Sequence, residues 1–202
     1  MIKNIVFDYG NVMIRFEPSY MVGRYVNDPD DARLLEKVVF DRLYWDRLDD
    51  GSISDAEVVE AVKGRIPERL WAVSEEIYYN WVNNLPEIDG MSDLVSYVKD
   101  ELGVRVFLLS NISTYFADHA SEREELEPFE RCIFSAVVGH TKPHADMFEH
   151  LCRECKIKPE ETLFVDDSAK NIAGAEAFGI KGYLFDGDSA RLRKYIDSLL
   201  GK

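Results

Sequence analysis

Acidic side chains follow two short apolar runs of the sequence, and their types suit the chemistry of phosphate groups. Asp8 comes directly after Ile5–Phe7, and the adjacent pair Asp166 and Asp167 comes directly after Thr162–Val165. A carboxylate in an exposed turn can act as a metal ligand or as a nucleophile. Oxygen ligands of this kind suit Mg²⁺, which keeps bound waters and bridges to phosphate. The carboxylates therefore predict a magnesium site if the two strands are neighbours.

Two further polar positions have the chemistry to hold a phosphate group. Ser110 and Asn111 end the apolar run Val104–Leu109, and a hydroxyl and backbone N–H groups there can cradle a phosphate oxygen. Lys142 precedes Pro143 at the expected start of a helix, where proline is favourable in the first turn. Its ammonium could neutralise charge that develops in a transition state. Taken singly, each position also has a structural explanation as a turn, a helix cap or a surface charge.

The elements that must position these residues alternate along most of the chain. Short apolar runs predict strands at Ile5–Phe7, Val104–Leu109, Ile133–Val138, Thr162–Val165 and Gly182–Phe185. Helical patterns lie between them at Met91–Leu102, Pro143–Cys155 and Ser168–Phe178. Such alternation predicts an α/β fold with a doubly wound, mainly parallel sheet. Ligands of these sheets bind at the carboxyl ends of the strands, where the polar groups above are found.

Residues 16–86 break the alternation and predict an inserted, all-helical segment. Ser54 and Glu57 have the spacing of a capping box, and no convincing strand pattern occurs in this range. The aromatic side chains of the segment are explained most simply as its own core. We therefore expect an α/β core made of residues 1–15 and 87–202, with residues 16–86 as a helical cap.

Composition and charge exclude several classes of partner. The 202 residues are 46% hydrophobic and carry a formal net charge of −14, which disfavours binding to nucleic acid and to anionic membranes. No apolar stretch approaches the ~18–20 residues of a membrane-spanning helix. The three cysteines and the lack of a secretory signal favour a reducing compartment, so the prediction is a cytoplasmic protein.

The ordered set of motifs resembles the haloacid dehalogenase superfamily of hydrolases. The resemblance is to its phosphatase-rich subfamily I, in which a helical cap lies between the first two motifs. The motifs are Ile5–Val12, Leu108–Asn111, Lys142–Phe148 and Leu163–Ala175. The resemblance covers almost the whole chain, and it implies a Rossmann-like, doubly wound core with an inserted all-helical cap.

The resemblance also implies a role for each motif residue. Asp8 would attack phosphorus and form an aspartyl-phosphate, and Lys142 would neutralise charge on Asp8 and on the phosphate. A phosphate oxygen would be held by the Ser110 hydroxyl and the Asn111 backbone. The Mg²⁺ ligands would be the Asp8 carboxylate, the backbone carbonyl of Gly10, Asp166 and, directly or through water, Asp167.

Gly10 departs from the pattern of most phosphatases in the superfamily. They carry a second aspartate at this position, two residues after the nucleophile, and it serves as general acid and base. Loss of such a group typically costs about 10²–10⁴-fold in rate. A subgroup with Asp-x-Gly-Asn-Val resembles this chain closely and includes sugar-phosphate phosphatases, among them those for α-glucose 1-phosphate. A good leaving group, a cap residue or a bound water could replace the missing acid.

The predicted function is Mg²⁺-dependent hydrolysis of a small phosphorylated metabolite, with a sugar phosphate as the expected substrate. In the cap, Arg42 and Trp45 are candidates to contact the part of the substrate other than phosphate. Two alternatives remain open. Asp8 could attack a carbon–halogen bond, a reaction that needs no Mg²⁺, or the chain could bind a phosphorylated metabolite without turnover. The sequence leaves open the metabolite, the oligomeric state and whether the cap rests open or closed.

Overall fold

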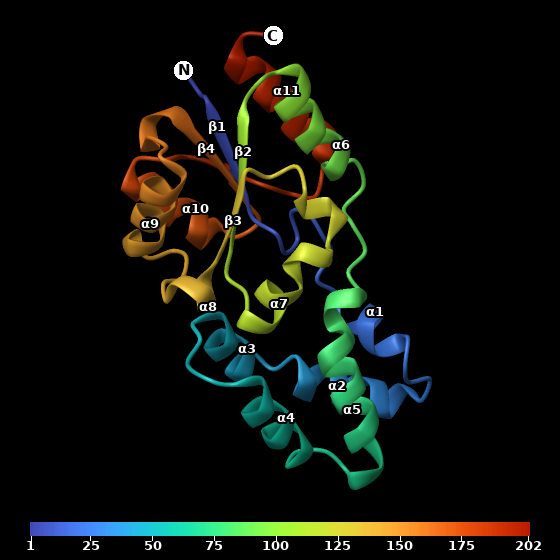
Figure 1. The fold of residues 1–202 in the computed structure, drawn as a ribbon. Coiled ribbons are helices and arrows are strands. Elements are labelled where there is room, and N and C mark those ends of the chain that lie inside the picture. Colours follow the sequence, from blue (N-terminus) through green and yellow to red (C-terminus); the bar gives the residue numbers. More distant parts are fainter.

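A five-stranded parallel sheet forms the centre of the computed structural model, which describes residues 1–202 (Figure 1). The strands are β1 (Asn4–Phe7), β2 (Arg105–Ser110), β3 (Arg131–Phe134), β4 (Thr162–Asp166) and β5 (Lys181–Leu184). Their order is β3-β2-β1-β4-β5, and every neighbouring pair is parallel. The chain therefore winds outward in both directions from β1, and the predicted α/β class with a parallel sheet is confirmed. Because β1 lies between β2 and β4, the first, second and fourth sequence motifs meet at one edge.

Helices cover both faces of the sheet. One face packs against α9 (Ala145–Cys155) and α10 (Ala169–Phe178), and the other against α6 (Met91–Ser96) and α11 (Ser189–Leu200) (Figure 1). The alternate residues of β1 divide accordingly, since Val6 belongs to the α9–α10 core and Phe7 to the larger core on the other face. Burial on both faces explains why the strands read as continuous apolar runs.

One predicted strand is shorter than expected. The apolar run Ile133–Val138 was predicted as a strand, but β3 ends at Phe134 and Ser135–Val138 form the short helix α8. The Ser135 side chain explains the change, because its Oγ accepts a hydrogen bond from Ile112 N at 2.8 Å. This hydrogen bond joins Ser135 to Ile112, which follows the end of β2, and the chain leaves the sheet at that point.

The start of the helix after Lys142 also differs from the prediction. Helix α9 begins at Ala145 with His144 at its N-cap position, so Pro143 precedes the helix instead of lying in its first turn. The Lys142–Pro143 peptide bond is cis. The side chain of Asn111 binds both backbone groups of Lys142, which holds that segment in an extended turn against the sheet.

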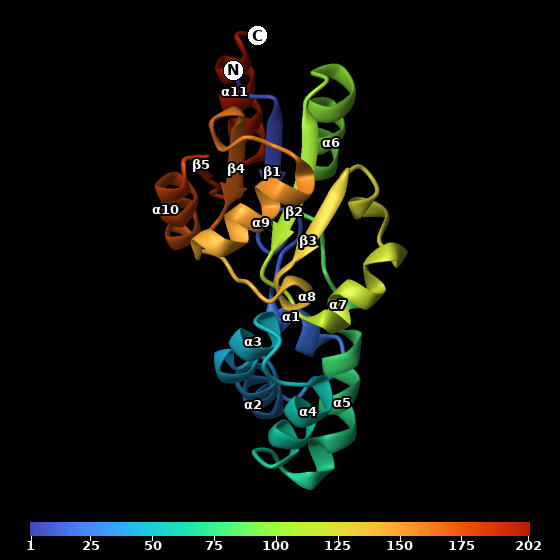
Figure 2. The ribbon, with the colours of Figure 1, turned by 60° about the vertical axis from the view of Figure 1, so that its left-hand side comes forward.

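Between β1 and α6 the chain forms a separate helical lobe below the sheet (Figure 2). Its helices are α1 (Pro18–Gly23), α2 (Pro29–Val39), α3 (Arg42–Asp49), α4 (Asp55–Lys63) and α5 (Trp71–Asn80). The capping box at Ser54 and Glu57 is present, with both reciprocal hydrogen bonds made. The two segments that join lobe and sheet run side by side, because Arg15 N donates to Pro86 O at 2.8 Å. The division at residues 16 and 86 stays a prediction, and these segments are where we expect it.

The short helix α7 (Thr114–His119) lies between the sheet and this lobe. Its Phe116 ring packs against Tyr9, which follows the nucleophile position, and against Trp81 at the end of the lobe, with ring centroids 4.8 and 5.7 Å apart. Phe116 is fully buried. The lobe is therefore packed onto the sheet through an aromatic contact that ends beside the first motif.

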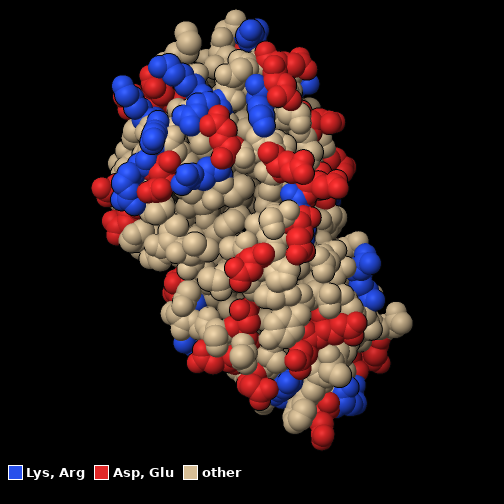
Figure 3. Space-filling model, viewed as in Figure 1, with Lys and Arg blue, Asp and Glu red and all other residues tan.

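Acidic side chains are spread over both parts of the molecule. Figure 3 shows Asp and Glu on both halves, whereas most of the Lys and Arg visible on that face lie over the half that contains the sheet. No helix combines the length and the apolar character needed to cross a membrane.

Candidate active site

A cavity of about 370 Å³ lies between the carboxyl ends of the strands and the helical lobe. Most of the residues predicted from sequence line it, from both sides: Asp8, Gly10, Ser110, Asn111, Lys142 and Asp167 from the sheet side, and Arg42 and Trp45 from the lobe. Asp166 is fully buried behind this surface. The structure thus brings together residues that are separated by more than a hundred positions in the chain.

Asp8 presents one free carboxylate oxygen to the cavity. Its backbone N–H donates to Val165 O at 2.9 Å, which fixes the turn after β1. Oδ1 accepts from Tyr9 N at 2.7 Å and lies 2.7 Å from Lys142 Nζ, while Oδ2 has no hydrogen-bond partner. Burial raises the pKa of Asp8 well above its usual range, and the nearby Lys142 ammonium opposes that shift. An unpaired oxygen on a buried, oriented carboxylate is suited to nucleophilic attack.

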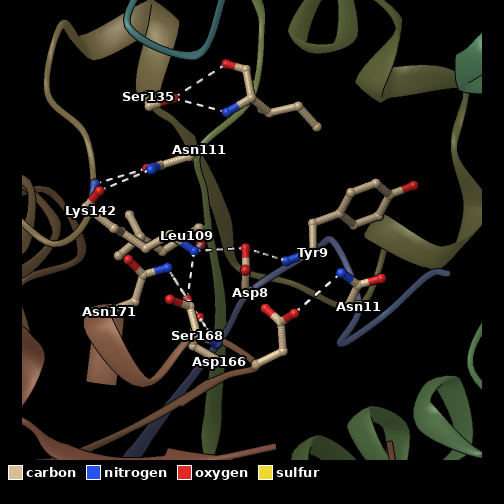
Figure 4. A network of polar contacts seen from close by, with 12 residues as sticks. Asp8, Tyr9, Asn11, Leu109, Asn111, Ser135, Lys142, Asp166, Ser168 and Asn171 are labelled. Atoms are coloured by element: carbon tan, nitrogen blue, oxygen red, sulfur yellow. Dashed lines mark hydrogen bonds and ion pairs between the residues drawn. The ribbon is translucent and has the colours of Figure 1, made fainter. Parts of the chain in front are cut away.

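Lys142 connects the carboxylates of the first and fourth motifs (Figure 4). Its Nζ lies 2.7 Å from Asp8 Oδ1 and donates to Asp166 Oδ2 at 2.8 Å and to Leu109 O at 3.0 Å. Burial alone would lower the pKa of Lys142, but the two carboxylates together raise it above its usual value. The ammonium therefore stays charged with all three of its donors engaged.

Asn111 acts on Lys142 through its side chain. Its Nδ2 donates to Lys142 O at 3.0 Å, and its Oδ1 accepts from Lys142 N at 2.8 Å. This double contact fixes the main chain from which the lysine extends (Figure 4). The neighbouring Ser110 is buried, lines the cavity and makes no side-chain hydrogen bond within the protein, so its hydroxyl can donate to a bound anion.

Asp166 is held by four hydrogen bonds. Oδ1 accepts from Ser168 N at 2.8 Å and from Asn171 Nδ2 at 3.1 Å, and Oδ2 accepts from Lys142 Nζ at 2.8 Å and from Asn171 Nδ2 at 3.1 Å. Asp167, in contrast, is exposed and accepts one hydrogen bond, from Asn11 Nδ2 at 3.2 Å. Partial desolvation of its carboxyl group by the surrounding protein nevertheless raises the pKa of Asp167, the adjacent Asp166 adds to that rise, and the hydrogen bond from Asn11 opposes it.

The donor set fits a divalent cation such as Mg²⁺. Ligand oxygens of Asp8, Asp166 and Asp167 lie within 4.8 Å of one another. These three carboxylates face one ammonium, so the cluster has an excess of negative charge that a cation would offset. All ligand atoms are oxygens, as Mg²⁺ prefers. Because the acceptor positions of Asp166 are filled, a cation bound there would replace one of its hydrogen bonds, of which the two from Asn171 are the longest.

The two lobe residues predicted from sequence differ in what they offer. Trp45 is buried, and its Nε1 donates to Val39 O at 2.8 Å, so only its ring is available to a ligand. Its ring stacks on Phe40 with centroids 5.4 Å apart, and both residues line the cavity. Arg42 is exposed and pairs with Asp46 at 2.6 Å. The lobe therefore contributes an apolar wall and one exposed cation.

Sequence reasoning gave no role to four residues that shape the site, although two of them lie within the first and fourth motifs. Asn171 lies in the first turn of α10 and binds Asp166, and its spacing from the acidic pair was the available signal. Asn11, with a φ of 55°, holds Asp167. Ser135 and Asp49 had no local signal, because they come from segments that meet the site only in the folded protein.

Comparison with known proteins agrees with this geometry. The sequence profile of the haloacid dehalogenase-like hydrolases matches residues 2–179. The chain is 28% identical over 198 residues to the D-ribitol-5-phosphate phosphatase of Bacteroides thetaiotaomicron, an alignment that covers 91% of each protein.

Two solved structures have the same fold. A predicted haloacid dehalogenase-like hydrolase from Porphyromonas gingivalis superposes with a TM-score of 0.72 at 26% identity, covering 100% of this chain and 99% of that one. A haloacid dehalogenase family enzyme of B. thetaiotaomicron, in complex with magnesium and inorganic phosphate, superposes with a TM-score of 0.69 at 20% identity, covering 95% and 99%. The chain belongs to the haloacid dehalogenase-like hydrolases.

Proposed function

We propose that this hydrolase is a Mg²⁺-dependent phosphatase that acts on a small phosphorylated metabolite through an aspartyl-phosphate at Asp8. The observation that carries the proposal is the free Oδ2 of Asp8, which faces the cavity while Oδ1 is fixed by Tyr9 N and Lys142. The nucleophile is therefore oriented before any substrate binds, and orientation is a large part of catalysis in phosphoryl transfer.

Asp8, Lys142 and Ser110 each have a separate role in the proposed reaction. Asp8 Oδ2 forms a bond to phosphorus as the bond to the ester oxygen breaks, and water then hydrolyses the resulting acyl phosphate to regenerate Asp8. Lys142 offsets negative charge at Asp8 and at the phosphoryl oxygens, and the Ser110 hydroxyl donates to one of those oxygens.

Magnesium would be held by Asp8, Asp166, Asp167 and the Gly10 carbonyl. When bound there, the ion neutralises the phosphate and the carboxylates around it. The acidic cluster supports this assignment, and so does the resemblance in fold to an enzyme that was crystallised with magnesium and phosphate.

A sugar phosphate or sugar-alcohol phosphate is the substrate class that we propose. Its support is the small cavity, with polar groups at the sheet and the Trp45 and Phe40 rings on the opposite wall. The phosphatase relative that is named for ribitol 5-phosphate is in agreement with this class. Within it, an anomeric 1-phosphate is the finer proposal, because its good leaving group needs the least acid assistance at a site with glycine at position 10.

The test is phosphate release from a panel of sugar and sugar-alcohol phosphates, with and without Mg²⁺. Wild type, Asp8→Asn and Asp93→Asn, a control at an exposed position of α6 outside the cavity, are compared at matched concentration. We expect Mg²⁺-dependent release that Asp8→Asn reduces by about 10⁴-fold or more, whereas Asp93→Asn retains it. Inactivity of a folded wild type on every phosphate, together with halide release from a 2-haloacid, would favour dehalogenation. Binding without either reaction would favour a non-catalytic role.

A further inference from the structure

Transfer of a phosphoryl group from a poor leaving group requires a proton donor near the ester oxygen, and Gly10 supplies none. Three carboxyl groups line the cavity, from Asp8, Asp167 and Asp49. Asp8 is assigned as the nucleophile, and Asp167 faces Asn11 in the acidic cluster. Asp49 is the remaining acid, and it is the only one of the three that comes from the helical lobe.

Asp49 lies at the C-terminal end of α3 and reaches the cavity from the wall opposite the sheet. Its side chain is half-buried and has no hydrogen-bond or ion-pair partner in the protein. Its helix neighbours are engaged, since Arg42 pairs with Asp46 and Asp50 accepts from Ser52 N at 2.8 Å. A desolvated acid with no protein partner, in the same cavity as a nucleophile, has the properties of a proton donor and acceptor.

The main chain of Asp49 is anchored to the sheet. Its carbonyl oxygen accepts a hydrogen bond from Ser135 Oγ at 2.5 Å, and Ser135 is fully buried. The same Oγ accepts from Ile112 N at 2.8 Å, beside the Ser110–Asn111 motif (Figure 4). At Gly51 a Cβ would lie 3.2 Å from Ala136 O, so the turn after α3 packs closely on α8. These contacts fix the position of Asp49 relative to the second motif.

The charge state of Asp49 suits both directions of proton transfer. Burial raises the pKa of Asp49 to about 7, with Asp46 and Asp50 adding to the rise and Arg42 and Lys142 opposing it. Both protonation states are therefore populated near neutral pH, which is the condition for an efficient general acid and base.

We propose that Asp49 is the general acid and base of this site and takes the role that position 10 lacks. The proposal rests on the phosphatase function above. Protonated Asp49 gives its proton to the ester oxygen as the P–O bond breaks and Asp8 Oδ2 bonds to phosphorus, so that a neutral alcohol leaves. The Asp49 carboxylate then takes a proton from water as that water's oxygen attacks phosphorus. The bond from phosphorus to Asp8 breaks, and inorganic phosphate is released.

The test compares Asp49→Asn with the adjacent control Asp50→Asn on aryl phosphates of similar size and graded leaving-group pKa. The value of kcat/KM reports the first step. For phenyl phosphate we expect Asp49→Asn to lower kcat/KM by about 10²–10⁴-fold, and for p-nitrophenyl phosphate by much less, since that leaving group needs little protonation. Asp50→Asn is expected to change kcat/KM for both substrates equally and only slightly.

Two further readouts separate catalysis from folding. The ratio of kcat/KM for the two substrates within one variant does not depend on the folded fraction, so partial misfolding cannot create the expected difference. Asp49→Asn is also expected to release one equivalent of p-nitrophenolate rapidly and then turn over slowly, because the second step lacks its base. In wild type, kcat/KM for phenyl phosphate should fall above about pH 7, and Asp49→Asn should lose that fall.

The outcomes separate this proposal from the one on which it rests. If wild type and Asp49→Asn respond identically to leaving-group pKa while Asp8→Asn is inactive, the phosphatase assignment stands and the role of Asp49 is overturned. If folded wild type releases no phosphate from any substrate, the phosphatase assignment fails, and the role of Asp49 fails with it.

Discussion

The two walls of the cavity are built in opposite ways. On the sheet wall, the side chains of Asp166 and Lys142 have every polar atom engaged, and Asp8 has one free oxygen. On the lobe wall, the Asp49 side chain has no partner, and the exposed Arg42 has one, the equally exposed Asp46. A densely bonded wall holds reacting groups in place, whereas a sparsely bonded wall can adapt to a ligand. The two proposals above match this difference: they assign phosphoryl chemistry to the sheet wall, and substrate recognition and proton transfer to the lobe wall.

The largest effect is expected from Lys142→Met, which removes the cation at the centre of the sheet wall. The variant leaves Asp8 and Asp166 as buried carboxylates without their ion-pair partner. We expect a loss of about 3–5 kcal/mol in the free energy of unfolding. Urea denaturation measures it, and the matched control is the exposed Lys170→Met on the same cavity. An equal, small change in the free energy of unfolding of both variants would show that the ion pairs of Lys142 with Asp8 and Asp166 do not stabilise the fold.

A smaller effect is expected from Asn171→Ala, which removes two hydrogen bonds from Asp166. Hydrogen bonds to a charged acceptor typically contribute about 1.5–3 kcal/mol, so the variant should unfold at lower urea concentration than wild type. Its affinity for Mg²⁺, measured by calorimetry, should also differ from that of wild type, because these two hydrogen bonds orient Asp166, an expected Mg²⁺ ligand. Unchanged stability and Mg²⁺ affinity would contradict the assignment of Asn171 to positioning Asp166.

Ser135→Ala tests the contact that joins the two walls. The variant loses the hydrogen bonds to Asp49 O and Ile112 N, and we expect about 1–2 kcal/mol of destabilisation. If the contact positions Asp49, the leaving-group dependence of kcat/KM should move toward that of Asp49→Asn. Ser135→Thr, which keeps the hydroxyl, serves as the rescue variant. Loss of stability with no kinetic change would make Ser135 a purely structural residue.

The smallest expected effect concerns Asp49 and pH. Its folded-state pKa of about 7 lies above the ~3.9 of an unfolded aspartate, so the folded protein binds more protons between these values. Stability from this group is therefore present below about pH 4 and is lost as pH rises through 7. Asp49→Asn should be more stable than wild type at pH 8 by about 1 kcal/mol, and the gap should close at pH 4. Thermal unfolding at the two pH values measures it, and a constant gap would contradict a raised pKa.

Several residues of the sheet wall could be predicted from the sequence because they lie at the ends of strands. A buried strand in a parallel sheet must end at the edge where its neighbours end, so Asp8, Ser110 and Asp166 could be placed together from local patterns. Local patterns failed at Ser135–Val138, an apolar run that a hydrogen bond from Ile112 N turns into a helix. They failed again at Pro143, where the amide of Asn111 holds the chain out of α9.

The sequence by itself determined the parallel α/β fold, the helical insertion and the four motifs, three of which lie at strand ends. Each of these depends on hydrophobic periodicity or on residues close together in the chain. Only the tertiary structure decided which oxygen of Asp8 is free, that Asn111 orients Lys142, and that Asp49 lines the cavity. These features depend on segments about 30 to 130 residues apart, which are brought together by packing around the sheet and, for Asp49, by packing of the lobe on the sheet; no local pattern encodes either.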